Sequence, residues 1–263
     1  MEAEPASTFG RGKTALLDAW FNSQKRQNAA GQTEYFHYKW SDFSNSGFST
    51  LGHIFRNYGA ITETLYDAPT VTNLRDAQIY LIVSPDIPTR NPSPHYMTAK
   101  DAEEIANWVR DGGVLVMMEN DSGNSEFEHF NLLSERFGIH FNAVIRNQVE
   151  GSRWEMGKVS VPQGTPMFPG ARTFYMKEIS TINVSKPAQP VVIDSGTVLM
   201  AIAQYGKGSV FAMTDPWLYN EYTDGLKLPP EYQNYEGGQE LAHWLLSEAS
   251  PIPRSRFTRE ETK

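Results

Sequence analysis

Apolar and polar residues alternate along the chain in blocks of the lengths expected for strands and helices. Residues 13–19, 60–65 and 79–84 are three short runs that predict strands, and the last, IYLIVS, is apolar at consecutive positions. A run of this last kind is typical of a strand buried on both faces of a parallel sheet. Between the first two runs we expect a helix, because apolar residues recur there at helical spacing: Phe48, Leu51, Phe55 and Tyr58.

The clearest unit is a strand–helix–strand crossover. It begins with the strand at 79–84, and Thr98 can cap the helix that follows. Gly112 and Gly113 end that helix, and residues 114–118 (VLVMM) form another doubly buried strand. A crossover of this kind predicts an α/β fold.

The rest of the chain predicts one further domain feature, a β-rich insertion. Residues 1–12 and 250–263 resemble tails, so a single α/β domain is expected over 13–249. Many turn residues and short Thr/Val segments predict that 143–195 is the insertion. The other expected elements are a helix over 126–137, a strand near 139–141, a hairpin of 198–203 with 209–213, and a closing helix at 239–246.

The composition and net charge of the chain argue against several classes of function. The chain has 263 residues, a net charge of −8, and no long block of like charge. Nucleic acid is not an expected partner, because that would require a clustered basic face. No apolar run approaches a membrane span, and the start lacks the basic and apolar parts of a signal peptide. Cysteine is absent, which excludes disulfides, thiolate metal sites and thiol nucleophiles.

Polar residues follow four of the predicted strands. Ligands of open parallel sheets sit outside the carboxyl ends of the strands, so these residues predict a binding rim. The competing interpretation is that Asp and Asn after a strand are common turn formers and helix caps, and that Trp217 and Tyr219 are core residues under a loop. Aromatic rings beside amides and carboxylates are typical of sugar recognition. The residues predicted to bind a sugar are Asp86, Glu119, Asn120, Asp121, Trp217 and Tyr219.

Histidines near carboxylates suggest acid–base chemistry or a metal. His37 lies in the aromatic segment FHYKW, and Glu128-His129 follows the polar loop after 114–118. With Asp215, these residues are the predicted catalytic set, and they are candidates to hold a divalent metal. No HExxH or HxH spacing supports the metal, so it stays an open alternative.

Several longer segments resemble a known family. The run WVRDGGVLVMMENDSGN resembles class I glutamine amidotransferase-like domains. Further segments resemble a domain attached to unsaturated rhamnogalacturonyl hydrolases of pectin-degrading bacteria, over about residues 10–248. They are GKTALLDAWFN, FHYKW, GFSTLGHIFRNYGA, ENDSGNSEFEHFNLLSERFGIHFN, YGKGSVFAMTDPWLYNEY and LPPEYQNYEGGQELAHWLL.

The resemblance implies a three-layer, flavodoxin-like sandwich and a part in pectin breakdown, in the periplasm or outside the cell. A cytoplasmic location stays open. Two departures limit what carries over. Glutaminase activity needs a cysteine near Asp121, and none is present. The hydrolase activity of that family belongs to a separate helical barrel, which this chain is not.

Three hypotheses follow. The domain acts on uronate-containing pectic oligosaccharides, it binds them without chemistry, or it is a structural partner that docks onto a helical-barrel glycoside hydrolase. Exposed apolar surface on 143–195 would favour the last. An acidic sugar would need local cations, and the candidates near the rim are Lys39, Arg56, Arg90 and Arg153.

Overall fold

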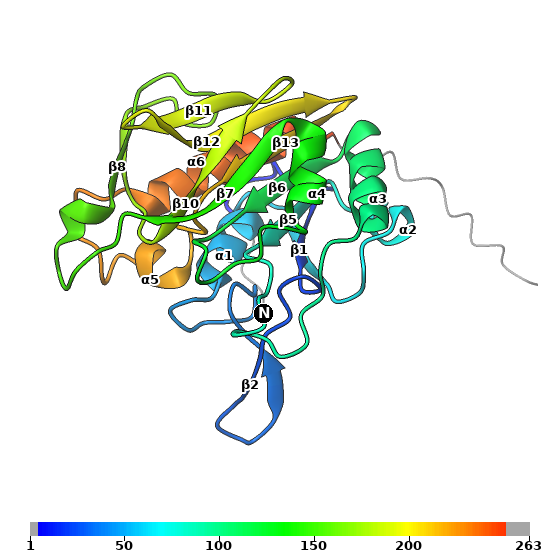
Figure 1. The fold of residues 1–263 in the computed structure, drawn as a ribbon, viewed down its shortest axis with the longest axis horizontal. Coiled ribbons are helices and arrows are strands. Elements are labelled where there is room, and N and C mark those ends of the chain that lie inside the picture. The colour runs from blue at the N-terminus through cyan, green and yellow to red at the C-terminus, as the bar shows by residue number, and fades with distance from the viewer. Residues whose placement is uncertain (1–4, 251–263) are drawn as a thin grey trace, which may run out of the picture.

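A sheet of nine strands forms the centre of the fold (Figure 1). The computed structural model describes residues 5–250. Five neighbouring strands of the sheet run parallel to one another. In chain order they are β1 (Thr14–Asp18), β4 (Ile61–Leu65), β5 (Ile79–Val83), β6 (Val114–Met118) and β13 (Gly208–Met213).

The other four strands of this sheet are antiparallel to their neighbours. They are β7 (Ile139–Arg146), β10 (Ile179–Val184), β11 (Gln189–Asp194) and β12 (Thr197–Tyr205). The order across the sheet is β4-β1-β5-β6-β13-β12-β10-β7, and β11 also pairs with β12. The fold is therefore α/β, with its five parallel strands together on one side of the sheet, which confirms the expected α/β class.

Two small hairpins lie outside this sheet. One consists of β2 (Lys25–Gln27) and β3 (Thr33–Tyr35), and it projects from the body of the domain in Figure 1. The other consists of β8 (Lys158–Val161) and β9 (Arg172–Tyr175).

Helices cover both faces of the sheet because side chains of the central strands alternate between two apolar clusters. In β5, Leu81 packs in a cluster with α1 (Ser49–Asn57) and α6 (Asn234–Glu248). Its neighbour Tyr80 packs in a second cluster, with α2 (Val71–Leu74), α3 (Ala99–Arg110) and α4 (Asn131–Ser134). The remaining short helices are η1 (Glu135–Phe137), η2 (Trp154–Gly157) and α5 (Asn220–Thr223).

The predicted crossover helix has the expected ends. The Thr98 side chain accepts a hydrogen bond from the Asp101 backbone N–H at 3.1 Å, and the Asp101 carboxylate accepts one from the Thr98 N–H at 3.0 Å. Gly112, with φ of +126°, follows the end of α3. This backbone conformation favours glycine, so the double glycine is a genuine stop signal.

Two expected elements differ in the structure. The helix expected over 126–137 is only α4 followed by η1, because the Glu126 carboxylate holds the backbone N–H groups of His129 and Phe130 in a turn. The segment 143–195 is β-rich, but most of its strands extend the main sheet, and only β8 and β9 form a sheet apart. No helix within residues 5–250 has the length and apolar character to cross a membrane.

Candidate functional site

The carboxyl ends of β1 and β5 lie side by side at the point where the strand order reverses. From β1 the chain continues to β4 on one side, and β5 lies on the other side. In open α/β sheets, ligands bind outside the carboxyl ends of the strands at such a switch point. A ligand site is therefore expected between the segments that follow the two strands, 19–24 and 84–97.

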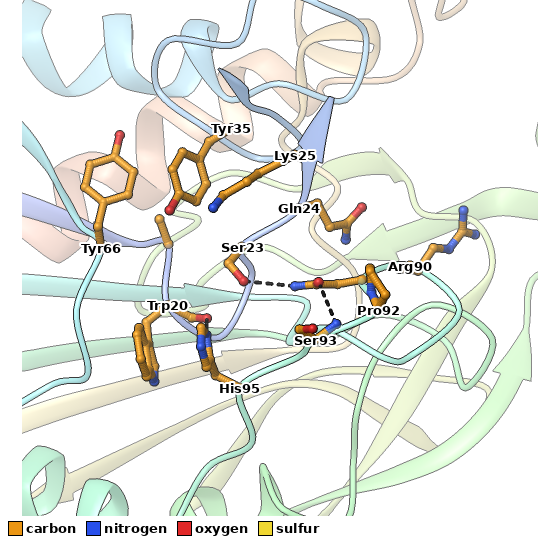
Figure 2. Close-up of a pocket in the computed structure, with 12 residues that line it drawn as sticks. Trp20, Ser23, Gln24, Lys25, Tyr35, Tyr66, Arg90, Pro92, Ser93 and His95 are labelled. Carbon is orange, nitrogen blue, oxygen red and sulfur yellow. Dashed lines mark hydrogen bonds between the residues drawn. The ribbon is translucent and has the colours of Figure 1, made fainter. Parts of the chain in front are cut away.

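A cavity of about 400 Å³ lies at this switch point (Figure 2). One of its walls is the Trp20 indole, which stacks on the His95 imidazole with ring centroids 3.5 Å apart and planes within 4°. His95 Nδ1 lies 2.9 Å from the Trp20 carbonyl oxygen, which fixes the orientation of the imidazole. The pair presents a flat aromatic surface to the cavity.

A second aromatic wall comes from the projecting hairpin and from the end of β4. Tyr35 ends β3 and Tyr66 follows β4, with ring centroids 4.8 Å apart. Lys25 is the cross-strand partner of Tyr35, and its Nζ lies 4.7 Å from the centre of that ring. Figure 2 shows these three side chains on one side of the cavity and Trp20 with His95 on the other.

The polar residues that line the cavity between the two walls include Ser23, Gln24 and Asn91. All three donate hydrogen bonds to the buried carboxylate of Asp86. Asp86 is fully buried, and its Oδ2 accepts hydrogen bonds from Ser23 N and Asn91 Nδ2, both at 2.7 Å. Its Oδ1 accepts one from Gln24 Nε2 at 2.8 Å. We predicted Asp86 as a sugar ligand. With three partners already, it instead joins the segment after β1 to the segment after β5, behind the residues that line the cavity.

A second buried network lies at the end of β1. The Asp18 carboxylate accepts hydrogen bonds from Tyr80 Oη at 2.7 Å and from Phe21 N at 2.8 Å. Burial raises the pKa of Asp18 to about 6, although the Tyr80 hydrogen bond opposes that shift. Lys39 Nζ donates to Asn22 O at 2.7 Å and to Asn22 Oδ1 at 3.0 Å. Burial lowers the pKa of Lys39 to about 8. Because Lys39 is only 2% exposed and donates to Asn22, it is not the rim cation we expected.

His37 lies next to the cavity network. Its Nδ1 is 3.2 Å from Gln24 Oε1, and its backbone N–H donates to Asp42 Oδ2 at 2.9 Å. Burial, with the nearby Lys39 and Arg90 charges, lowers the pKa of His37 to about 4. The imidazole is therefore neutral at pH 7, and its predicted role in acid–base chemistry stays a prediction.

The predicted sugar-binding residues that follow β6 form hydrogen bonds within their own loop and to Tyr38. Glu119 is fully buried; its Oε1 accepts a hydrogen bond from Asn120 N at 3.1 Å, and its Oε2 has no partner within residues 5–250. Burial raises the pKa of Glu119 well above its usual value. The Asn120 amide donates to Tyr38 Oη at 3.1 Å, and Asp121 Oδ1 accepts from Gly123 N at 2.7 Å.

Of the predicted site residues that follow β13, Asp215 and Trp217 are too buried to form the surface of a binding site. Trp217 is fully buried and stacks on Phe174 with ring centroids 4.2 Å apart, so the expectation of an exposed sugar-stacking face there is wrong. Tyr219 is half-buried, and its ring centroid lies 6.0 Å from that of Tyr38. Asp215 is 1% exposed, and in the described part of the chain neither carboxylate oxygen has a hydrogen-bond partner. Burial raises the pKa of Asp215 well above its usual value.

The predicted metal set does not assemble. His129 Nδ1 lies 3.0 Å from Glu126 Oε1, and its ring stacks on Tyr96 at 4.6 Å. Glu128 is exposed. Across residues 5–250, no group of three or more histidines, aspartates and glutamates is placed to hold a metal ion. His37, Glu128, His129 and Asp215 therefore lack the geometry of a metal site.

The other cations predicted for the rim have partners elsewhere. Arg56 donates to Thr62 Oγ1 at 3.0 Å, and Arg153 donates to Glu150 Oε2 at 2.7 Å. Arg90 lines the cavity, but it donates to Asn124, and in Figure 2 its side chain points away from Trp20.

The aromatic residues of the cavity were missed by the sequence prediction, except that Trp20 follows the first strand directly. Tyr66 directly follows the predicted strand at 60–65, whereas Tyr35 and His95 come from segments for which no strand or helix was predicted. Only the strand order brings those segments together. A useful signal would have been the positions of Trp20 and Lys25 soon after the first strand, since the segment that leaves this strand lies at the switch point.

Comparison with known proteins identifies a family. The model of a family described as "Domain of unknown function (DUF4350)" matches residues 41–246. The chain belongs to the DUF4350 family. Among curated proteins, none matches this DUF4350 chain significantly.

Solved structures share the fold of this DUF4350 domain at low identity. The mmIFT52 N-terminal domain matches with a TM-score of 0.64 and 19% identity, over 89% of this chain and 97% of that one. The cytoplasmic protein STM1381 from Salmonella typhimurium LT2 matches with a TM-score of 0.59 and 13% identity, over 90% and 100%. A β-galactosidase from Rahnella sp. R3 matches with a TM-score of 0.53 and 14% identity, over 92% of this chain but 33% of the enzyme.

These findings correct the family resemblance drawn from the sequence. The matching family is DUF4350, and the structural neighbours include the IFT52 and Salmonella proteins. The resemblance to an amidotransferase-like domain tied to rhamnogalacturonyl hydrolases is therefore wrong. Its quoted segments include the parallel strands and their connections, which many α/β domains share in pattern.

Proposed function

We propose that this DUF4350 domain binds a carbohydrate in the switch-point cavity. The observation that carries the proposal is the pair of facing aromatic walls, Trp20 with His95 and Tyr35 with Tyr66. Sugar rings present C–H faces that pack on aromatic rings, and their hydroxyl groups bind amides and hydroxyls. The pectic identity of the sugar rested on the corrected resemblance, so the proposal now rests on the cavity alone.

Binding without hydrolysis is the form of the proposal that this cavity favours. Glycoside hydrolysis ordinarily requires two carboxyl groups flanking the scissile bond. Among the described residues that line the cavity there is no aspartate or glutamate. The nearest organising carboxylate discussed above, Asp86, already accepts three hydrogen bonds.

The competing hypothesis of a structural partner finds little support in 143–195. Its exposed large apolar side chains among the described residues are Val144, Ile145 and Ile193, which are 41%, 42% and 52% exposed. Single aliphatic side chains with about this exposure are ordinary on soluble proteins. We therefore favour the ligand-binding proposal.

We also propose a finer fold class, the flavodoxin-like three-layer sandwich. Numbered in chain order, the parallel strands β4-β1-β5-β6-β13 have the order 2-1-3-4-5, which is the flavodoxin-like order. The apolar clusters on the two sheet faces supply the outer layers.

The test is calorimetric titration with neutral and acidic methyl glycosides, using one variant of the cavity and one matched control. Tyr66→Ala removes a ring that is 48% exposed and should weaken binding about tenfold, the upper range for one aromatic contact. Tyr96→Ala removes a ring that is 38% exposed and outside the cavity, and it should leave the affinity unchanged. If no glycoside binds at millimolar concentration, the proposal is wrong.

A further inference from the structure

Lys25 and Arg90 are the two cationic side chains that line the cavity, and neither has an acidic partner within residues 5–250. Arg90 donates to Asn124 and points away from Trp20 in Figure 2, whereas Lys25 lies beside the aromatic wall. Within residues 5–250, its ammonium group forms no ion pair, and its only close neighbour of note is the Tyr35 ring at 4.7 Å. The next residue shows the contrast. Arg26 pairs with Glu34 at 2.8 Å and with Asp42 at 3.3 Å. Of the two adjacent cations in this hairpin, Arg26 therefore has carboxylate partners, whereas Lys25 lines the cavity without one.

The position of Lys25 is set by the hairpin. Lys25 and Tyr35 are cross-strand partners in β2 and β3, so their side chains emerge on the same face. Figure 2 shows the Lys25 side chain running beside the Tyr35 ring on the side of the cavity that also holds Tyr66. An ammonium group is thus held next to the aromatic wall on which a sugar ring would pack.

No carboxylate among the described lining residues competes for this ammonium group. The protein carries a net charge of −8, so its overall field does not attract an anion. Since Arg90 donates to Asn124, the Lys25 ammonium group beside the aromatic wall is the feature that can discriminate an acidic sugar from its neutral counterpart.

We propose that Lys25 is a specificity-determining residue, and that the ligand class of this cavity is a hexuronic acid or an oligosaccharide that contains one. The Lys25 ammonium group binds the sugar carboxylate, while Trp20 or Tyr35 packs against the ring. This inference rests on the proposed carbohydrate binding.

The experiment compares methyl galacturonoside with methyl galactoside, which share their ring stereochemistry and differ in the carboxylate. Calorimetry on the wild type should show up to about fivefold tighter binding of the acidic sugar, the effect of one exposed ion pair. Lys25→Gln should reduce the affinity for the acidic sugar to that for the neutral one. Lys25→Arg should keep the preference. Lys207→Gln, which removes an exposed lysine at the distant β12–β13 turn, should change neither affinity.

The salt dependence of the wild type gives a readout that needs no variant. The preference for the acidic sugar should shrink between 20 mM and 500 mM salt, because salt screens an exposed ion pair. Binding of neither sugar overturns the carbohydrate proposal and this inference together. Equal binding of both sugars to the wild type, or a preference that survives in folded Lys25→Gln, overturns the Lys25 inference while the carbohydrate site stands.

Discussion

Replacement of Asp86 by asparagine tests whether this buried residue organises the cavity. The wild-type carboxylate accepts three hydrogen bonds at 2.7–2.8 Å from Ser23, Gln24 and Asn91, and it is fully buried. An asparagine offers one oxygen and places an N–H₂ group toward the remaining donors. At least one acceptor position is lost in a site without access to water.

The magnitude follows from these contacts. A hydrogen bond to a charged group contributes about 1.5–3 kcal/mol, and a buried donor left unsatisfied costs about 1–3 kcal/mol. Since such effects overlap, we expect Asp86→Asn to lower the free energy of unfolding by about 3 kcal/mol. For a domain of this size that corresponds to a decrease in Tm of about 6–12 °C. Sugar binding should also weaken, because the segments after β1 and β5 are no longer joined.

The assay is urea unfolding followed by far-UV circular dichroism, with Asp111→Asn as the control. Asp111 is exposed at the end of α3, and its replacement should change stability by less than about 0.5 kcal/mol. If Asp86→Asn proves as stable as this control, the three hydrogen bonds do not join the segments after β1 and β5, and the role given to Asp86 is wrong.

Three further predictions concern buried and half-buried side chains. Trp217→Ala should destabilise the fold by about 3–5 kcal/mol in thermal or urea unfolding, since it empties a core position; a stable variant would contradict its burial. Trp20→Ala should weaken sugar binding about tenfold in calorimetry and leave the protein folded, since the indole is half-buried; unchanged affinity would exclude the Trp20 wall. Asp215→Asn should become more stable relative to the wild type as the pH rises above about 4. Above that pH Asp215 ionises in the unfolded wild type, whereas in the folded wild type its raised pKa keeps it protonated, so only the wild type loses stability. Unfolding curves at pH 4 and pH 8 that show no such divergence would contradict an unpaired Asp215.

The sequence predicted the parallel half of the sheet well because each of its strands carries a strong local signal. The runs at 79–84 and 114–118 are apolar at consecutive positions, and both are fully buried strands in the structure. Thr98 and the double glycine also marked the ends of α3 correctly. These features depend on neighbours a few residues away, which is the range over which sequence patterns are informative.

The prediction of the site was less successful because burial depends on the whole fold. Trp217 follows a strand, as a rim residue should, yet its ring turns into the core against Phe174. Conversely, Tyr35 and Tyr66 belong to different connections and meet only because β4 lies beside β1 in the sheet. Neither strand order nor side-chain direction can be obtained from the spacing of polar residues.

The most direct test of carbohydrate binding in the switch-point cavity follows the indole N–H signals of the six tryptophans by NMR. The Trp20 signal is assigned with Trp20→Phe, and methyl galacturonoside is titrated into protein labelled with ¹⁵N-tryptophan. We predict a saturable shift of the Trp20 signal, while the signal of Trp217, buried in the core, stays in place. If the Trp20 signal does not move while the sugar reaches about 10 mM, well above the millimolar Kd of a weak complex, the cavity is not a carbohydrate site.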